Sequence, residues 1–273
     1  MIVAGIDMGA RSIKVVLLEL GHMDVPRVLT RHLMFPEALD MDAAAERAYA
    51  DALQAAGLEA GQVQRIVATG VARRQVRFAY DDVTEVASGG RGAAFLFPVA
   101  RTVIDVGAEE ARAIHLGSTG RVADFAGNEK CAAGAGAFAE SMARALQLSL
   151  AGFGAASLRS TQAIPMNAQC TVFAESEVVS LIHAATPVED IARAVLDAVA
   201  SRICAMARRV GIEEEVALIG GMAHNPGFVR ALRESLGVER LLLPDQPEHV
   251  AALGAALIAA DEVDKPGSAR IKH

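Results

Sequence analysis

The sequence is poor in aromatic residues and in positive charge. Its 273 residues contain no tryptophan and two tyrosines, and aromatic residues make up 4% of the chain. Few side chains could therefore stack on nucleic-acid bases. The 26 lysines and arginines are scattered and are outnumbered by 33 aspartates and glutamates, which leaves a net charge of −7. This balance argues against an electrostatic nucleic-acid site, and we predict no nucleic-acid partner.

Cysteine is also scarce. Cys131, Cys170 and Cys204 are odd in number and widely spaced, which fits neither a secreted disulfide framework nor a CxxC zinc site. No apolar run reaches transmembrane length, and "MIVAGIDMGARS" lacks the basic start and apolar core of a signal peptide. We therefore expect a cytoplasmic protein with reduced thiols and no membrane contact.

Strand-like and helix-like segments alternate along the chain. Hydrophobic residues make up 52% of it, enough for a substantial core in one or two globular domains. We expect a strand hairpin at the start, then a helix over 42–57 that Asp42 caps and Gly57 ends. Further expected segments are strands over 63–69 and 215–219, helices over 132–146, 188–210, 226–237 and 249–262, a Gly-rich loop up to 154, and a strand-like start at 170 that turns into a helix.

One supersecondary unit occurs twice. "TVIDVGAEEARAIHL", from residue 102, can be laid on "AGIDMGARSIKVVLL" with a constant offset of 98 residues. The matched pairs are Ile6 and Ile104, Asp7 and Asp105, Gly9 and Gly107, Ala10 and Ala108, and Lys14 and Arg112. The repeat predicts an α/β protein of two similar halves facing a cleft, to which each hairpin brings an aspartate and a glycine.

We place the first half over residues 1–98, joined by the C-terminal helix 249–262. The second half covers 99–248 and carries Cys131 and Cys170. The polar tail 263–273 is expected to be flexible.

The two Asp-x-Gly hairpins are candidates for phosphate and metal binding. A glycine directly after an apolar strand lets backbone N–H groups approach phosphate oxygens, and the nearby carboxylate can hold a hydrated Mg²⁺. Either hairpin alone is more simply an ordinary turn. A third loop, "LIGGMAHN", places Gly220 and Gly221 after a buried strand, where a purine and ribose can lie against the backbone. The three loops together favour a nucleoside triphosphate as the ligand.

At these loops the chain resembles the actin, Hsp70 and sugar-kinase superfamily of ATPases. "GIDMGARSIK" is similar to its first phosphate loop, "VIDVGAEEARA" to its second and "IGGMAHNPGFVRAL" to its adenosine loop. The resemblance implies an actin-like, ribonuclease-H-like α/β fold with a nucleotide cleft, and Asp7, Asp105 and Glu110 as catalytic residues. The residues implied to contact ATP and Mg²⁺ are Gly9, Ala10, Arg11, Ser12, Lys14, Gly107, Ala108, Gly220, Gly221 and Asn225.

Two further segments, "NEKCAAGAGAF" and "CTVFAESEV", are more specific. They resemble the signatures of the ATPase subunits of benzoyl-CoA reductases and of the activators of 2-hydroxyacyl-CoA dehydratases. In that family the two matching cysteines, here Cys131 and Cys170, are metal ligands. Each of two subunits contributes both cysteines, and the four together hold one [4Fe–4S] cluster at the dimer interface. The resemblance also implies ferredoxin as electron donor, a second ATPase subunit of the same family, and iron–sulfur catalytic subunits that bind an aryl-CoA.

The residues themselves are compatible with such a cluster. A [4Fe–4S] cluster normally needs four thiolates, which two chains with two cysteines each would supply. Both cysteines precede predicted helices, whose N-termini favour the thiolate form. Gly134 and Gly136 would let the backbone come close to the cluster, whereas Cys204 falls inside a predicted helix and is left out of the site. Any single cysteine is more simply a small buried side chain.

The second phosphate loop departs from the activator pattern. The activators carry Gly-Gly-Gln-Asp where this chain has Gly107, Ala108, Glu109 and Glu110, and Ala137 stands where an arginine is usual. These departures resemble the smaller ATPase subunit of benzoyl-CoA reductases. We therefore expect an ATP-hydrolysing electron-activation subunit of such a reductase, with a homodimeric dehydratase activator as the alternative.

Other interpretations stay open. A sugar or acyl kinase, or an actin-like assembly or sensor protein, would use the same loops without a cluster. Gly134, Gly136 and Ala139 also fit the dinucleotide pattern G-x-G-x-x-A, but no strand precedes them directly and no acid follows at the required distance. Glu175 and Glu177 are either cleft residues or acids that favour a helix N-terminus.

Overall fold

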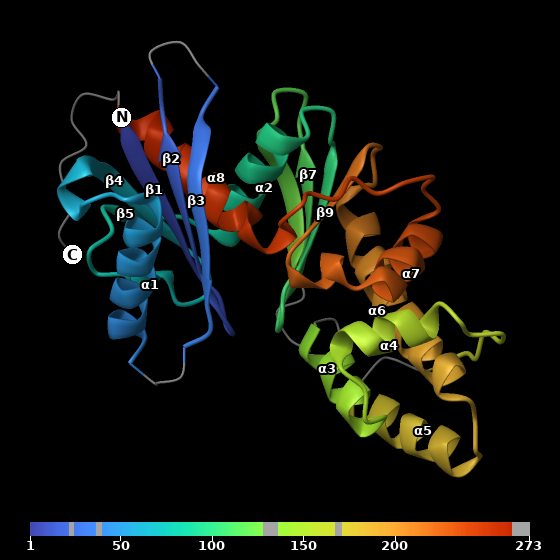
Figure 1. Ribbon diagram of the computed structural model, residues 1–273. Coiled ribbons are helices and arrows are strands. Elements are labelled where there is room, and N and C mark those ends of the chain that lie inside the picture. Colours follow the sequence, from blue (N-terminus) through green and yellow to red (C-terminus); the bar gives the residue numbers. More distant parts are fainter. Residues whose placement is uncertain (22–24, 37–39, 128–135, 167–170, 264–273) are drawn as a thin grey trace. The chain divides into compact units, whose positions relative to one another are not determined.

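The computed structural model describes residues 1–21, 25–36, 40–127, 136–166 and 171–263. The chain divides into two units, each with its own sheet (Figure 1). The first comprises residues 1–98, 120–122 and the chain from 248 onward, and the second comprises 99–119 and 123–247. None of the helices within the described ranges is both long and apolar enough to cross a membrane.

The first unit is a mixed sheet with strand order β3-β2-β1-β4-β5. Its strands are β1 (Ile2–Met8), β2 (Ile13–Glu19), β3 (Arg27–Met34), β4 (Val63–Thr69) and β5 (Asp81–Asp82), and its helices are α1 (Met41–Ala56), α2 (Glu85–Leu96) and α8 (Val250–Val263). β1 pairs antiparallel with β2, as the hairpin prediction required, and parallel with β4.

Alternation along β1 decides which helix covers which face of this sheet. Ala4, Ile6 and Met8 belong to the apolar cluster that α1 completes, whereas Val3 belongs to the cluster formed with α8. Because successive side chains of a strand point to opposite faces, one strand contributes to both layers. The helix α1 ends at Gly57, in the left-handed conformation, as predicted.

The predicted cap of α1 is wrong by two residues. Asp40, not Asp42, is the N-cap, and its side chain accepts a hydrogen bond from the backbone N–H of Ala43 at 3.1 Å. Asp42 lies in the first turn and pairs with Arg77, with Oδ2 2.8 Å from Nε. Both aspartates precede the apolar run, so the sequence alone did not separate the cap from the first-turn acid.

The helices α2 and α8 pack together through residues without bulky side chains. A Cβ placed on Gly254 of α8 would overlap the backbone carbonyl of Ser88 in α2, and one on Gly92 would overlap the carbonyl of Val250. On the other side of α8, a Cβ on Gly5 of β1 would overlap the carbonyl of Ala252. The close approach of α8 to both neighbours therefore depends on glycine.

Gly254→Ala is expected to lower the free energy of unfolding by about 1–3 kcal/mol, the usual cost of an overpacked core. The added methyl group meets backbone, which cannot rotate away as a side chain can. Chemical denaturation measures the effect. Gly61→Ala is the matched control, since a Cβ there meets nothing within 4 Å. Equal stability of the two variants would contradict the assignment of Gly254 to this contact.

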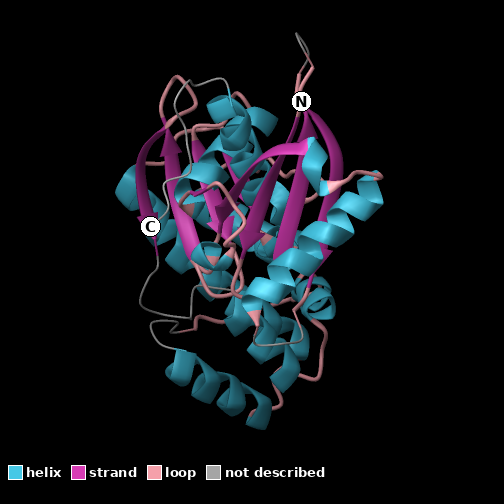
Figure 2. Cartoon of the chain, turned by 90° about the vertical axis from the view of Figure 1, so that its left-hand side faces the viewer, coloured by secondary structure: helices cyan, strands magenta, loops and turns pink. Residues whose placement is uncertain are grey.

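The second unit is a sheet with strand order β8-β7-β6-β9, and four of its helices follow one another in the chain between β8 and β9. Figure 2 distinguishes the strands of the chain, in magenta, from its helices, in cyan. The strands of this unit are β6 (Thr102–Val106), β7 (Ala111–Leu116), β8 (Val122–Gly127) and β9 (Val216–Ile219), and its helices are α3 (Gly136–Ala145), α4 (Leu150–Ser157), α5 (Thr171–His183), α6 (Val188–Val210) and α7 (Pro226–Leu236). β6 pairs antiparallel with β7 and parallel with β9.

The strand registers confirm the internal repeat. Asp7 lies opposite Lys14 in the β1–β2 pair, and Asp105 lies opposite Arg112 in the β6–β7 pair. Each partner is displaced by the same 98 residues that the sequence comparison used. The two hairpins are therefore built on one plan.

Two expectations for the second unit are wrong. The Gly-rich segment before residue 154 is the helix α4, capped by Ser149, whose side chain accepts from the N–H of Gly152. The segment after residue 170 begins directly as the helix α5, not as a strand. The predicted helix 132–146 is described from Gly136 as α3, while α6 ends before Gly211 as expected. Residues 132–135 and 264–273 lie outside the described ranges.

Candidate functional site

In the first unit, the predicted phosphate loop is a turn held by an ion pair. Lys14 Nζ lies 3.1 Å from Oδ2 of Asp7, and the two side chains are 13% and 10% exposed. The same Nζ donates to the carbonyl of Ser12 at 3.3 Å, and the N–H of Gly9 donates to that carbonyl at 3.1 Å. Ala10 is exposed at the tip of the turn. The ammonium group of Lys14 thus holds the turn closed, and the carboxylate of Asp7 balances its charge.

The second unit repeats this arrangement with arginine as the cation. Arg112 Nη1 lies 3.7 Å from Oδ2 of Asp105, and Arg112 also pairs with Glu110. The N–H of Gly107 donates to the carbonyl of Glu110 at 2.9 Å, which closes the turn that also contains Ala108. The carboxylate of Glu110, predicted to be catalytic, is therefore engaged by a cation of the neighbouring strand.

A glycine with positive φ lies against each aspartate. Gly220 follows β9 with φ 86°, and a Cβ on it would be 2.7 Å from Oδ1 of Asp105. Gly70 follows β4 with φ 96°, and its Cβ would be 2.6 Å from Oδ1 of Asp7. Sequence reasoning proposed Gly220 but missed Gly70. The Thr-Gly turn at the end of a predicted strand was the available signal.

The third predicted loop begins at Gly220 and continues as the short helix η4 (Gly221–His224). A Cβ on Gly221 would meet nothing within 4 Å, so the backbone is open on that side. Asn225 is buried and caps α7: its Oδ1 accepts from the N–H of Phe228 at 2.9 Å and its Nδ2 donates to the carbonyl of Leu150 at 3.2 Å. Both ends of the Asn225 amide are therefore hydrogen-bonded within the protein. The expected contact of Asn225 with adenosine stays a prediction.

A protein-family model covers residues 4–259 of the chain and describes the BadF/BadG/BcrA/BcrD ATPase family. The chain belongs to this family of ATPases. It is 36% identical over 264 residues to the activator of lactoyl-CoA dehydratase of Anaerotignum propionicum, covering 96% of this chain and 98% of that one. It is 30% identical over 270 residues to a benzoyl-CoA reductase subunit of Thauera aromatica, covering 97% and 95%.

Structural similarity leads to the same family. The solved activator of 2-hydroxyisocaproyl-CoA dehydratase from Clostridium difficile, with bound ADPNP, superposes with a TM-score of 0.87 at 31% identity, over 96% of this chain and 95% of that one. The predicted actin-like α/β ATPase fold is confirmed. The family includes activators of dehydratases and a benzoyl-CoA reductase subunit, so membership alone does not choose between them.

The predicted metal ligands of this ATPase, Cys131 and Cys170, lie outside the described residues, as does Gly134. Cys204 is buried in α6, and its Sγ donates to the carbonyl of Ser235 at 3.0 Å. Within the described ranges, no cluster of three or more histidine, cysteine, aspartate or glutamate residues could hold a metal ion.

The two glutamates of α5 lie beyond its first turn. Because the helix dipole acts on charges only within about the first turn, the helix-terminus interpretation of Glu175 and Glu177 does not hold. The interpretation as cleft residues stays a prediction.

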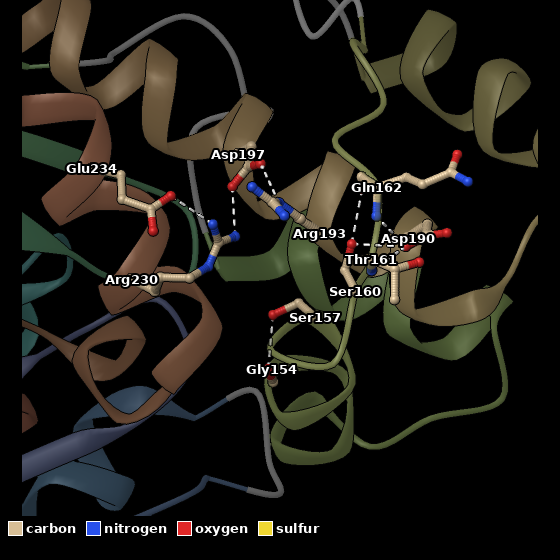
Figure 3. A network of polar contacts seen from close by, with 10 residues as sticks. All are labelled: Gly154, Ser157, Ser160, Thr161, Gln162, Asp190, Arg193, Asp197, Arg230 and Glu234. Atoms are coloured by element: carbon tan, nitrogen blue, oxygen red, sulfur yellow. Dashed lines mark hydrogen bonds and ion pairs between the residues drawn. The ribbon is translucent and has the colours of Figure 1, made fainter.

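The segment that leads from α4 toward Cys170 is anchored by Asp190 of α6 (Figure 3). The Asp190 carboxylate is buried and accepts from Ser160 Oγ at 2.8 Å, from the N–H of Thr161 at 2.9 Å and from that of Gln162 at 3.1 Å. These hydrogen bonds, that of Ser160 first, hold the pKa of Asp190 below its ordinary value. The ionised carboxylate therefore fixes the segment at neutral pH.

Asp190→Asn is expected to lower the denaturant midpoint of unfolding at pH 7, by an amount that shrinks as the pH falls below about 4. The native carboxylate has a lowered pKa, so its contribution is present above the unfolded-state pKa of about 4 and is lost as pH falls through the native value. Midpoints of both proteins measured from pH 7 to pH 3 test this. A difference that does not shrink toward acid pH would contradict the role of the ionised form.

Proposed function

We propose that this ATPase is an electron-transfer activator. ATP binding and hydrolysis in the chain would drive low-potential electrons into an iron–sulfur partner that acts on an acyl-CoA. The observation that carries the proposal is the duplicated arrangement of aspartate, cation and positive-φ glycine, seen at Asp7, Lys14 and Gly70 and again in the second unit. Two loops of this kind are what the resemblance to the actin, Hsp70 and sugar-kinase superfamily implies for an ATPase.

The first loop would bind the phosphates. Backbone N–H groups from Ala10 to Ser12, with Lys14, would donate to phosphate oxygens, as a glycine-rich turn and its lysine do elsewhere. Asp7 and Asp105 offer hard carboxylate oxygens, which suit Mg²⁺ held through water. Gly221 would leave room for the purine and ribose against open backbone, and Gly220, packed against Val106 and Asp105, forms the turn that leads to it. When bound, Mg²⁺ would neutralise charge that develops on the phosphates.

Glu110 is the acid nearest in sequence to the position where the activators carry aspartate. Its pairing with Arg112 gives it a defined place in the loop. We propose that Glu110 orients the attacking water and that Asp7 is a catalytic carboxylate of the first loop.

The cysteine inventory fits a cluster shared between two chains. Cys204 is buried and committed to Ser235, which leaves Cys131 and Cys170 as two thiolates per chain against the usual four per cluster. A second ATPase subunit, identical or of the same family, would supply the other two. Such a cluster, when bound, supplies one-electron transfer, with a ferredoxin-class protein as the donor.

A 2-hydroxyacyl-CoA dehydratase is the partner that the comparisons favour. The chain is more similar to the lactoyl-CoA dehydratase activator, at 36% identity, than to the benzoyl-CoA reductase protein, at 30%. We therefore propose the activator role, in a homodimer, ahead of the reductase role. The reductase remains the second candidate because Gly107 to Glu110 departs from the activator sequence. A kinase role would leave both cysteines unexplained.

Anaerobic purification of the native assembly tests the proposal. We expect a brown dimer with about four irons, ATP hydrolysis, and ATP-dependent electron transfer from reduced ferredoxin to the co-purifying subunits. Dehydration of a 2-hydroxyacyl-CoA by those subunits would support the activator role, and reduction of benzoyl-CoA would support the second candidate. A colourless, iron-free protein that phosphorylates a sugar or acyl substrate would refute both.

A further inference from the structure

The first turn of α3 is hydrogen-bonded to the second phosphate loop. The N–H of Gly136 donates to the carbonyl of Gly107 at 2.9 Å, and the N–H of Ala137 donates to the carbonyl of Ala108 at 2.7 Å. The first N–H groups of a helix have no partner within it and are usually satisfied by a capping side chain or by water. Here two consecutive carbonyls of the loop take that role, so the loop itself caps the helix.

Gly136 is also pressed between this loop and the third one. A Cβ on Gly136 would be 3.0 Å from the carbonyl oxygen of Gly107 and 3.2 Å from both Cγ and Sδ of Met222, which is buried in η4. The helix start therefore touches two of the three loops assigned to the nucleotide. Both contacts lie within the second unit.

The same peptide units face the phosphates and the helix. The carbonyl of Gly107 and the N–H of Ala108 belong to one planar trans peptide and point in opposite directions. If the N–H of Ala108 turns to donate to a phosphate oxygen, the carbonyl on the other side must turn with it. That carbonyl holds the N–H of Gly136, so the start of α3 must follow.

The rest of α3 can transmit such a movement. Phe138, Ala139, Met142 and Ala143 are buried in the main apolar cluster of the unit, and α3 packs against α4, α5 and α6. In sequence, α3 begins five residues after Cys131, and α5 begins directly after Cys170. Both cysteine segments thus lead into helices that touch each other.

We propose that the Gly136–Ala137 pair is the positioning element that couples the nucleotide state of the loop from Gly107 to Glu110 to the cysteine segments. The inference rests on the proposed function, because it supposes nucleotide at these loops and a redox group at the cysteines. A nucleotide can shift the start of α3 between two positions only if it binds one of them more tightly than the other. The coupling is reciprocal: the factor by which the nucleotide changes the affinity for an oxidised or reduced redox group is also the factor by which that group changes nucleotide affinity.

Ala137→Pro removes one of the two bonds. Proline has no N–H, and the first turn of a helix tolerates its ring. Ala137→Ser is the matched control, since it changes the side chain but keeps the backbone donor. Thermal unfolding of both variants identifies a folding defect, and Gly136→Ala, which presses on the Gly107 carbonyl, provides a second route to the same disturbance.

Hydrogen exchange of peptides from α3 is the first readout. In the wild type and in Ala137→Ser, replacing MgADP by MgADPNP is expected to change exchange in residues 138–145. In Ala137→Pro that change should be lost, while protection around Gly9 by either nucleotide persists. This readout does not depend on cluster content.

The second readout is the ratio of MgADPNP dissociation constants between the oxidised and reduced protein. We expect this ratio to fall toward one in Ala137→Pro, by between about twofold and thirtyfold, as for other residues within a coupling network. An unchanged ratio, together with an unchanged exchange response of α3, would overturn the inference while the proposed function stands. Absence of nucleotide binding or of iron in the wild type would instead refute the proposed function.

Discussion

Replacement of Cys131 by alanine abolishes iron binding if the cluster assignment is correct. The wild-type dimer is expected to hold about four irons, and the variant should hold almost none, because two of four thiolates are lost in every symmetric dimer. Iron analysis and the visible absorption of anaerobically purified protein measure this. The loss should be nearly complete, since two thiolates without further donors do not retain a four-iron cluster.

The third cysteine provides the control for that experiment. Cys204→Ala is expected to retain iron and colour, because Cys204 lies buried in α6 and its Sγ donates to a backbone carbonyl. Cys170→Ala should behave like Cys131→Ala. Full iron retention in Cys131→Ala would refute the assignment, whereas iron loss in Cys204→Ala would place a ligand where the structure places a packed side chain.

Asp7→Asn should reduce the turnover number for ATP hydrolysis by about 100- to 1,000-fold, the usual loss when one preorganised electrostatic group is removed from an active site. Asparagine has nearly the same shape but no charge, so it can neither balance Lys14 nor attract Mg²⁺ through water. Phosphate release at saturating MgATP measures the turnover number.

Asp42→Asn is the matched control for this change. Asp42 belongs to the same unit and also pairs with a cation, Arg77, whose side chain is 83% exposed. An exposed pair contributes little, so turnover and stability should stay close to those of the wild type. Asp7→Asn with wild-type turnover would remove Asp7 from the catalytic residues. Unfolding midpoints of both variants separate loss of chemistry from loss of fold.

Much of the local structure could be predicted because it depends on contacts between sequence neighbours. The β1–β2 and β6–β7 hairpins need only a short turn between two apolar runs, so "GIDMGARSIK" and its repeat specify them directly. The ends of α1 and α6 follow from Gly57 and Gly211, which accept backbone conformations that other residues avoid.

The wrong prediction for α4 has its cause in packing. α4 was expected to be a loop because Gly152 and Gly154 disfavour helix. In the folded unit a Cβ on Gly154 would collide with Asn225, so the glycine is required by packing and the helix forms in spite of its propensity. Propensity expresses the cost within one segment, whereas the gain from packing comes from residues far away in the sequence.

The sequence by itself determined the two Asp-x-Gly hairpins, the aspartate and cation in each, and the family signatures around the cysteines. Only the tertiary structure brought Gly70 against Asp7, through the parallel pairing of β1 with β4, and Gly107 against Gly136, through the capping of α3. In both contacts the backbone of a glycine lies against a segment far away in the sequence. A backbone hydrogen bond leaves little trace in residue identity beyond a glycine, so no local pattern in the sequence could have named its partner.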